Sequence, residues 1–472
     1  MIDIDRWSFR PMTRLAINPT SRTISQEDFE RALDELPFGK KHGLVVLLAA
    51  SAILANGAAN QAIGYSLPSI AAEFSSGAGF FLPMLGLGLF GMMIGSLSAG
   101  LVADRIGRRP TLYACVILFA IATTLMSLAS SVGVMIALRF FVGLGLGGAL
   151  PCSTTLAGET TPKAWRTAMI TIVILCVPLG GMLAGIAAEL LLPSLGWRGL
   201  HVCIGAFGLI VGMILFGFVP ESPRFLARKI NDDAGLSGLL SRLVSRQPAQ
   251  SSQTRAHSQS FAQTPGTNVK LADVISVRRD AFALCFSFFS CLFVVYCAFN
   301  WLPILLTSHG AEPSLAARGL TFFNLGGVIG PVACAFMIGQ FGSRKTLVGF
   351  SLAATITAFC LAIGGADPIG IAQYLAIGLI GFFVNSVQSS LFVVAAHIFP
   401  TSSRAKGTST ALAAGFFGAI LSTFAGGTLV TAERISPFFF ALSILTLICA
   451  MSIFTVRNSI PPTVRSGPAK IS

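Results

Sequence analysis

The sequence predicts an all-α membrane protein with twelve transmembrane helices in two six-helix bundles. Hydrophobic residues make up 54% of the 472 residues and charged residues only 11%, whereas a soluble domain carries about 25% charged residues. The apolar residues gather in long runs, and the Lys and Arg residues fall between alternate runs. So much apolar surface cannot be hidden from water, so the chain needs lipid around it.

Each predicted span has roughly the 20 apolar residues that a bilayer crossing takes. The spans are 44–68, 79–102, 111–130, 134–157, 168–191, 200–219, 281–305, 316–339, 346–364, 370–397, 407–431 and 437–456. A polar segment between the sixth and seventh spans is predicted to be a flexible linker. The predicted organisation is an N-terminal tail (1–42), a first bundle (43–219), the linker (220–280), a second bundle (281–456) and a C-terminal tail (457–472).

The positive charges predict the orientation of the chain. All but four of the 32 Lys and Arg residues lie in the tails, the linker and the loops of one side. Arg139 falls inside a span, and Arg198, Arg318 and Arg434 fall on the other side. The positive-inside rule then places both termini in the cytoplasm of a multi-pass inner (plasma) membrane protein. The net charge of +13 follows from this topology, and no nucleic-acid partner is expected.

The ten cysteines all lie within apolar runs, without CxxC spacing or a paired histidine. We interpret them as small packing residues, in preference to disulfide or metal-binding residues. No metal site, cofactor or enzymatic activity is predicted.

The segment Gly100–Arg109 is a short charged turn between two apolar runs. Its glycines allow two helix ends to approach closely, and Asp104 can pair with an arginine or cap a helix N-terminus. With a second charged segment, Pro220–Arg224, it is predicted to form a cytoplasmic ion-pair network that latches the two halves. Separate solvated charges are the alternative. The predicted gating residues are Gly100, Asp104, Arg105, Gly107, Arg108, Glu159, Glu221, Arg224 and Arg404.

Arg139 is a charge inside the fourth span, at the start of a glycine-rich stretch. Gly143 and Gly147 follow at i+4 and i+8, so they share its helix face and permit close helix packing. An embedded charge is costly and is a functional candidate by default. Arg139 either recognises an anion or partners a titrating group; alternatively it reaches the outer interface or bonds backbone carbonyls.

Paired six-helix halves hold the substrate between them near mid-membrane, and polar and aromatic side chains of the spans are candidates for that site. Each of them can instead serve packing or helix–helix hydrogen bonding. The predicted substrate-binding residues are Arg139, Gln61, Tyr296, Trp301, Gln388 and Asn56. Further polar residues of the spans are Asn60, Asn300, Asn324, Asn385 and His397.

The segment Gly100–Arg109 resembles the loop between helices two and three of the major facilitator superfamily. Pro220–Arg224 resembles another loop of that superfamily. The resemblance implies the major facilitator fold and a secondary transporter that works by alternating access.

Residues 44–455 are similar to one branch, the aromatic acid:proton symporters. The similarity includes helix one at Asn56–Gly64, helix four at Arg139–Pro151, and Tyr296. It implies transport of a small organic acid, an aromatic carboxylate, with a proton as the coupling ion, by a protein that acts as a monomer in the bilayer.

The chain departs from the branch at three positions. Asn56 and Ala59 replace two acidic residues that the branch ties to proton coupling, and Phe416 replaces an arginine associated with substrate transport. The titratable groups considered lie near one face of the membrane or the other. They are Glu159, Glu189, His309, His397 and Glu433. We therefore predict weak coupling to a pH gradient. Two alternatives stay open: a facilitator or exporter of a neutral aromatic compound, and a transport-inactive membrane sensor or partner protein.

Overall fold

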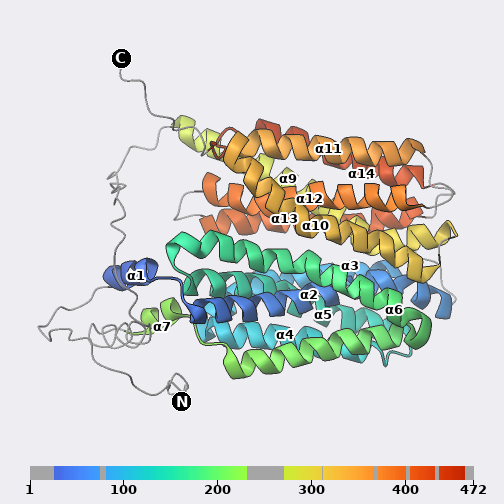
Figure 1. Cartoon of the computed structure of the whole chain (residues 1–472), viewed down its shortest axis with the longest axis horizontal. Coiled ribbons are helices and arrows are strands. Elements are labelled where there is room, and N and C mark those ends of the chain that lie inside the picture. The colour runs from blue at the N-terminus through green and yellow to red at the C-terminus, as the bar shows by residue number, and fades with distance from the viewer. Residues whose placement is uncertain are drawn as a thin grey trace, which may run out of the picture.

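The computed structural model of the chain describes residues 26–74, 81–230, 271–310, 312–364, 370–399, 404–430 and 435–462. These residues form helices and connecting turns, with no strand among them. Helices α2–α6 lie together as one bundle and α9–α14 as a second (Figure 1).

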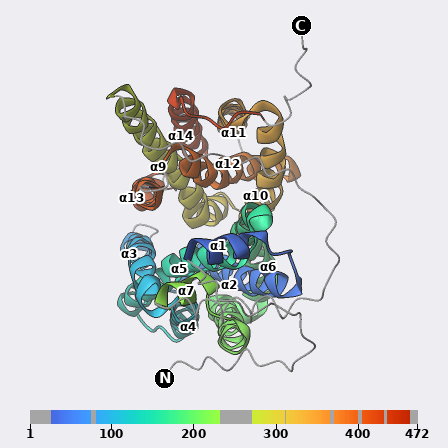
Figure 2. The same cartoon turned by 90° about the vertical axis from the view of Figure 1, so that its left-hand side faces the viewer.

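The first bundle begins after a short helix, α1, and is followed by another, α7. Its helices are α2 (Lys40–Glu73), α3 (Leu82–Ile106), α4 (Arg108–Met126), α5 (Val132–Thr160) and α6 (Lys163–Phe218). The short helices are α1 (Gln26–Glu35) and α7 (Pro223–Lys229), which lie at the end of the first bundle that faces the viewer in Figure 2.

Helix α6 contains two membrane crossings. Its 56 residues would extend about 84 Å as one straight helix, far beyond a hydrocarbon core of about 30 Å. Gly196 interrupts it with a φ of 61° and a ψ of −172°, and Figure 1 shows that α6 doubles back on itself. Eleven described helices are long and apolar enough to cross a membrane, and α6 divided at Gly196 gives the twelve crossings that the sequence predicts.

The second bundle is formed by α9 (Leu271–Ser308), α10 (Pro313–Phe341), α11 (Ser343–Gly364), α12 (Ile371–Ile398), α13 (Arg404–Val430) and α14 (Ser436–Thr455). The segment predicted as the linker, 220–280, contains α7 and the first ten residues of α9. Its middle, 231–270, lies outside the described residues.

The two bundles repeat one packing plan. In the first, α2 packs on the first half of α6, α3 on α5, and α4 on the second half of α6; in the second, α9 packs on α13, α10 on α12, and α11 on α14. Across the bundles α2 meets α9, α3 meets α13, and α6 meets α10. The predicted fold of two six-helix bundles is confirmed.

We call the end of the molecule that carries Gly196 the Gly196 end, and the opposite end the α7 end. The two bundles touch each other from the middle of their helices to the Gly196 end. A Cβ on Gly64 of α2 would lie 2.0 Å from the carbonyl oxygen of Phe299 of α9, and one on Gly86 of α3 would lie 3.6 Å from the Phe424 ring of α13. The bundles are thus closed against each other at the Gly196 end.

Candidate gating network and substrate site

The turn between α3 and α4 is fastened by a carboxylate from a distant loop. Glu221 Oε1 accepts the backbone N–H groups of Arg108 at 2.8 Å and Arg109 at 3.2 Å, so it caps the N-terminus of α4, where a negative charge is stabilising. Gly107 has a φ of 119°, and a Cβ there would lie 2.2 Å from Glu221 Oε2. Only glycine fits this turn without strain.

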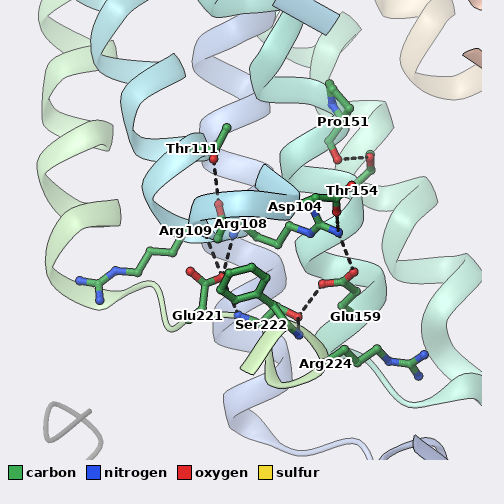
Figure 3. A network of polar contacts seen from close by, with 12 residues as sticks. Asp104, Arg108, Arg109, Thr111, Pro151, Thr154, Glu159, Glu221, Ser222 and Arg224 are labelled. Atoms are coloured by element: carbon green, nitrogen blue, oxygen red, sulfur yellow. Dashed lines mark hydrogen bonds and ion pairs between the residues drawn. The ribbon is translucent and has the colours of Figure 1, made fainter. Parts of the chain in front are cut away.

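Arg108 ties the turn to two other helices. Its Nη2 lies 2.7 Å from Asp104 Oδ1 of α3 and 3.4 Å from Glu159 Oε1 of α5. The Ser222 hydroxyl donates to Glu159 Oε2 at 2.5 Å (Figure 3). Arg108 is only 7% exposed, so its charge is paired where water is scarce. Asp104 thus pairs with an arginine, one of the two roles that its position predicts.

The N-terminal helix α1 docks beside this network through an acidic side chain. Asp34 accepts hydrogen bonds from Arg166 at the start of α6 and, at 2.6 Å, from Arg224 of α7. Glu30 Oε2 lies 3.9 Å from Nη1 of Arg224. Arg224 is thus directed away from Glu159 (Figure 3).

Apolar contacts also hold α1 in place, and the sequence analysis missed this element. Phe29 is fully buried and Leu33 is 9% exposed, both packed against Ala227 of α7. Phe29 and Leu33 are four residues apart, as are Glu30 and Asp34. That spacing is the sequence signal of an amphipathic helix with an acidic edge.

Among the described residues the network joins helices of the first bundle. The latch between the two halves stays a prediction, because its partner in the second bundle is not among the described side chains. Gly100 and Arg105, two predicted gating residues, are exposed, and Arg105 makes no ion pair within the part of the chain that is described. The side chain of Arg404 lies outside the described residues.

The second bundle solves the same capping problem with different groups. Gly342, with a φ of 82°, takes the place of Gly107, and the carbonyl of Ile460 accepts the Ser343 N–H at 2.9 Å. Fully buried Asp280 accepts the N–H groups of Arg457 at 3.0 Å and Asn458 at 2.9 Å. The sequence analysis missed Asp280, because a lone acid beside two arginines at a predicted linker boundary gives no signal.

Arg139 lies at the interface of α5 with α2 and α3 and is 6% exposed. Nη2 donates to the carbonyl of Asn60 at 3.0 Å and Nη1 to that of Ala59 at 3.5 Å, while Nε has no hydrogen-bond partner. A Cβ on Gly88 of α3 would lie 2.8 Å from the Arg139 side chain. The arginine bonds carbonyls, as one alternative predicted, yet keeps one donor unused.

Helix α9 brings Tyr296 of the second bundle beside Arg139 and Asn60. Its hydroxyl lies 3.7 Å from the sulfur of Met92 of α3. Its ring packs edge-on against Phe299, with centroids 5.7 Å apart. Of the predicted substrate residues, the structure brings Arg139 and Tyr296 together across the two bundles.

The other predicted substrate residues have different surroundings. Asn56 donates to the Leu146 carbonyl at 2.8 Å within the first bundle, and Gln61 bonds Asn324 of α10. Trp301 is fully buried in the second bundle, beside α13. Gln388 is half-buried on α12, and no described residue hydrogen-bonds its amide.

One buried titratable group escaped the sequence analysis. His201 of α6 is 1% exposed, and its Nδ1 lies 2.9 Å from the Trp197 carbonyl and 3.4 Å from the Ser66 hydroxyl. It is five residues past Gly196, close to the end of the crossing, so it is not a mid-membrane group.

Comparison with known proteins gives a consistent result. The model of a family described as "Sugar (and other) transporter" matches residues 79–465. The 4-hydroxybenzoate transporter PcaK of Pseudomonas aeruginosa is 30% identical, covering 88% of this chain and 92% of that protein. The gallate transporter of Pseudomonas putida is 28% identical, covering 90% and 93%. The benzoate transport protein of Acinetobacter baylyi is 26% identical, covering 90% and 92%.

A solved structure shares the fold. The xylose transporter XylE from E. coli, in a partially occluded inward-open conformation, superposes with a TM-score of 0.68 at 16% identity, covering 88% of this chain and 97% of that one.

The first prediction concerns the two glycines of the α3–α4 segment. We expect Gly107→Ala to lower the unfolding temperature of the purified protein, because the positive φ alone costs about 1–3 kcal/mol and the methyl group would displace Glu221. Gly100→Ala is the matched control: its Cβ would meet nothing within 4 Å, and alanine favours the helix. Equal unfolding temperatures for the two variants would contradict the capping role of Glu221.

The second prediction concerns Asp104. We expect Asp104→Asn to fold and insert normally but to slow transport about tenfold, equal to about 1.4 kcal/mol of barrier, because Arg108 loses its 2.7 Å ion pair. Uptake into proteoliposomes at matched protein content measures this. A variant that transports at the native rate would show that Asp104 plays no part in the cycle.

Proposed function

The chain belongs to the sugar (and other) transporter family of the major facilitator superfamily, and from that premise we propose that it moves an aromatic carboxylate across the membrane by alternating access. The relatives named above carry 4-hydroxybenzoate, gallate or benzoate in their names, and each of these is a benzene ring bearing a carboxylate. The proposal includes no covalent chemistry and no cofactor, and the protein acts as a monomer.

The observation that carries the proposal is the position of Arg139. The charged residues that are buried among those described are Arg108, Arg139 and Asp280, and Arg108 and Asp280 lie at the α7 end. Of these three, Arg139 is the buried cation away from the α7 end, and its Nε lacks a partner among the described residues. A carboxylate in a low-dielectric site needs a paired cation and hydrogen bonds.

Neighbouring groups suit the remainder of an aromatic acid. Asn300, one helical turn beyond Tyr296 on α9, is 5% exposed and its amide N–H₂ has no partner, so it offers a second donor. Tyr296, Phe299 and Phe323 form a chain of edge-on aromatic contacts. Ligand sites of this kind are mostly apolar with a few placed polar groups. Gln61 and Gln388 supply further amides when the bundles part.

The distribution of Lys and Arg supports an inner-membrane protein with both termini in the cytoplasm. The α7 end then faces the cytoplasm, and the described state is closed toward the outside. The network around Arg108, with Glu159, Glu221 and Arg224, then stiffens the cytoplasmic end of the first bundle as it rocks against the second. Arg404 is the residue of the second bundle that we propose to meet it when that end closes.

One observation favours a second candidate function. Asn56 bonds a backbone carbonyl and cannot titrate. Phe416 is 8% exposed, at a position where the resemblance to the symporter branch implies an arginine. A site with one cation accepts larger and less charged aromatic compounds more readily, so facilitated transport or export of a neutral aromatic compound is the alternative.

A third prediction tests the anion site. We expect Arg139→Ala to weaken binding of benzoate-class acids about 10- to 100-fold, since a hydrogen-bonded charge contributes about 1.5–3 kcal/mol. The affinity of Arg139→Lys should lie between those of the native protein and Arg139→Ala, because lysine keeps the charge but lacks the planar guanidinium group. Lys345→Gln, at an exposed lysine of the α7 end, is the control for altered net charge.

Titration calorimetry of the native protein and these variants decides the matter. A carboxylate bound equally well by all of them would remove Arg139 from the site. Exclusive binding of neutral or cationic ligands would overturn the organic-acid assignment itself.

A fourth prediction concerns coupling. The described spans hold no acid or histidine at mid-membrane. We therefore expect a pH gradient of one unit to change the uptake of an aromatic acid into proteoliposomes by less than about threefold. A carrier that couples one proton to each substrate could reach a change of about tenfold. An uncoupler provides the zero-gradient control. Strong pH-driven accumulation that persists in Glu159→Gln, His201→Gln and His397→Gln would contradict this account.

A further inference from the structure

Helix α10 turns a polar stripe toward the first bundle. Arg318, Thr321 and Asn324 follow at intervals of three residues, so they lie along one side of the helix. Their neighbours lie on α2 and α6. The stripe runs along the line where the two bundles are closed, from mid-helix to the Gly196 end.

At its inner end the stripe forms a reciprocal pair of amides. Gln61 Nε2 donates to Asn324 Oδ1 at 2.9 Å, and Asn324 Nδ2 donates to Gln61 Oε1 at 2.5 Å. Both side chains are fully buried. Asn324 also donates to the Tyr65 hydroxyl at 3.3 Å, and that hydroxyl donates to the Gly181 carbonyl at 2.8 Å. Asn324 Nδ2 also lies 2.9 Å from the Leu320 carbonyl of its own helix. Buried polar groups from three helices thus form one hydrogen-bonded cluster.

Two glycines of α6 make room for this pairing. A Cβ on Gly181 would lie 2.1 Å from Nε2 of Gln61, and one on Gly185 would lie 2.1 Å from the Thr321 hydroxyl and 2.7 Å from that of Tyr65. Larger residues at these positions would hold α2 and α10 away from α6. The close approach is therefore built into α6 at a spacing of one helical turn.

At its outer end the stripe closes with an ion pair. Arg318 donates to Glu189 Oε1 through Nε at 2.8 Å and through Nη2 at 2.5 Å. Glu189 lies one turn beyond Gly185 on the same face of α6. The two side chains are 46% and 33% exposed, so this pair is hydrated whereas the amide pair is dry.

We propose that Gln61–Asn324 and Glu189–Arg318 are the two levels of the gate at the Gly196 end, and that Gln61 links this gate to the substrate site. This inference rests on the proposed function, since a carrier that alternates access must open that end. Asn60, the residue before Gln61, supplies the carbonyl that holds Arg139. A ligand that draws on Arg139 therefore acts on the residue next to the inner level of the gate.

Polar closure suits a contact that must open and close repeatedly. When the bundles part, each amide exchanges its partner for water, and a hydrogen bond within the protein is only slightly more stable than one to water. An amide whose partner is removed, however, stays buried and unsatisfied in the closed state. Single substitutions should therefore open the gate, and restoring a matched pair should close it.

Cross-linking the outer level tests the gate directly. Glu189→Cys/Arg318→Cys is prepared in the full chain with a protease site inserted in the segment 231–270, so that only cross-linked halves remain joined after cleavage. The native chain and each single cysteine variant control for the ten natural cysteines. We expect the cross-linked carrier to transport no labelled benzoate and to recover on reduction. Undiminished transport by the cross-linked form would overturn the proposal.

The inner level is tested by the rate of the same cross-link. We expect Gln61→Leu or Asn324→Leu to slow it about tenfold, and the exchanged pair Gln61→Asn/Asn324→Gln to restore it to within about twofold. If Gln61→Leu alone affects the protein and the exchanged pair fails to restore the rate, Gln61 is a ligand contact and not a gate residue.

The two arms separate this inference from the proposed function. The cross-linking rate needs no substrate, so it reports on the gate even if none of the aromatic acids is transported. The cysteine variants leave the amides intact, so they decide the matter even if the leucine variants fail to fold. A cross-linking rate that ignores both leucine substitutions refutes the inner level, whatever the substrate.

Discussion

A polar group buried in this protein must find its partner inside the protein, because lipid offers none and an unsatisfied group costs several kcal/mol. Arg108 shares its charge with Asp104 and Glu159, and Asp280 accepts two backbone N–H groups. Gln61 and Asn324 satisfy each other. Some buried side-chain atoms of the described residues have no partner, among them the Nε atoms of Arg108, Arg166, Arg224 and Arg279, which lie at the α7 end. Two others are Arg139 Nε on α5 and Asn300 Nδ2 on α9, and Asn300 lies one helical turn beyond Tyr296, so a ligand with acceptor oxygens could partner both.

The same constraint applies to both bundles, which share one packing plan but differ in the polar groups that cap their helices. Each bundle must cap the N-terminus of a helix that follows a left-handed glycine, Gly107 or Gly342. The first bundle uses the Glu221 carboxylate for this, and the second uses the Ile460 carbonyl. Among the described residues, no ion pair beside Gly342 corresponds to that of Arg108 with Asp104. The bundles are alike in shape, but among the described residues the network of Asp104, Arg108 and Glu159 belongs to the first, and the second has the Asp280 cluster instead.

The fold was predictable because span length, charge placement and a few local motifs are properties of short stretches of chain. The pairing of Asp104 with an arginine followed from such a motif. The pairing of Gln61 with Asn324 was not predictable, since 263 residues separate them and each amide alone suits a ligand equally well. The docking of α1 was missed because the tail was judged by its polarity, although its Phe29 and Leu33 share a face. Trp301 was assigned to the substrate site from its type, whereas Gly426 of α13 leaves room for its ring inside the second bundle.

The polar contacts of the protein are of two kinds: rigid contacts within a bundle and reversible contacts between the bundles. Within the first bundle, Glu221 and Arg108 hold helix ends at short range and have no reason to part during the cycle. Between the bundles, the contacts at the Gly196 end combine a dry amide pair with a hydrated ion pair, and both can exchange their partners for water at little net cost. Rocking then proceeds by breaking polar contacts between two bodies that stay intact. Arg139 lies where the two kinds of contact meet: it is anchored to α2 within one bundle and adjoins Tyr296 of the other. A ligand bound there therefore contacts both bodies at once, and its binding free energy acts on the equilibrium between their arrangements.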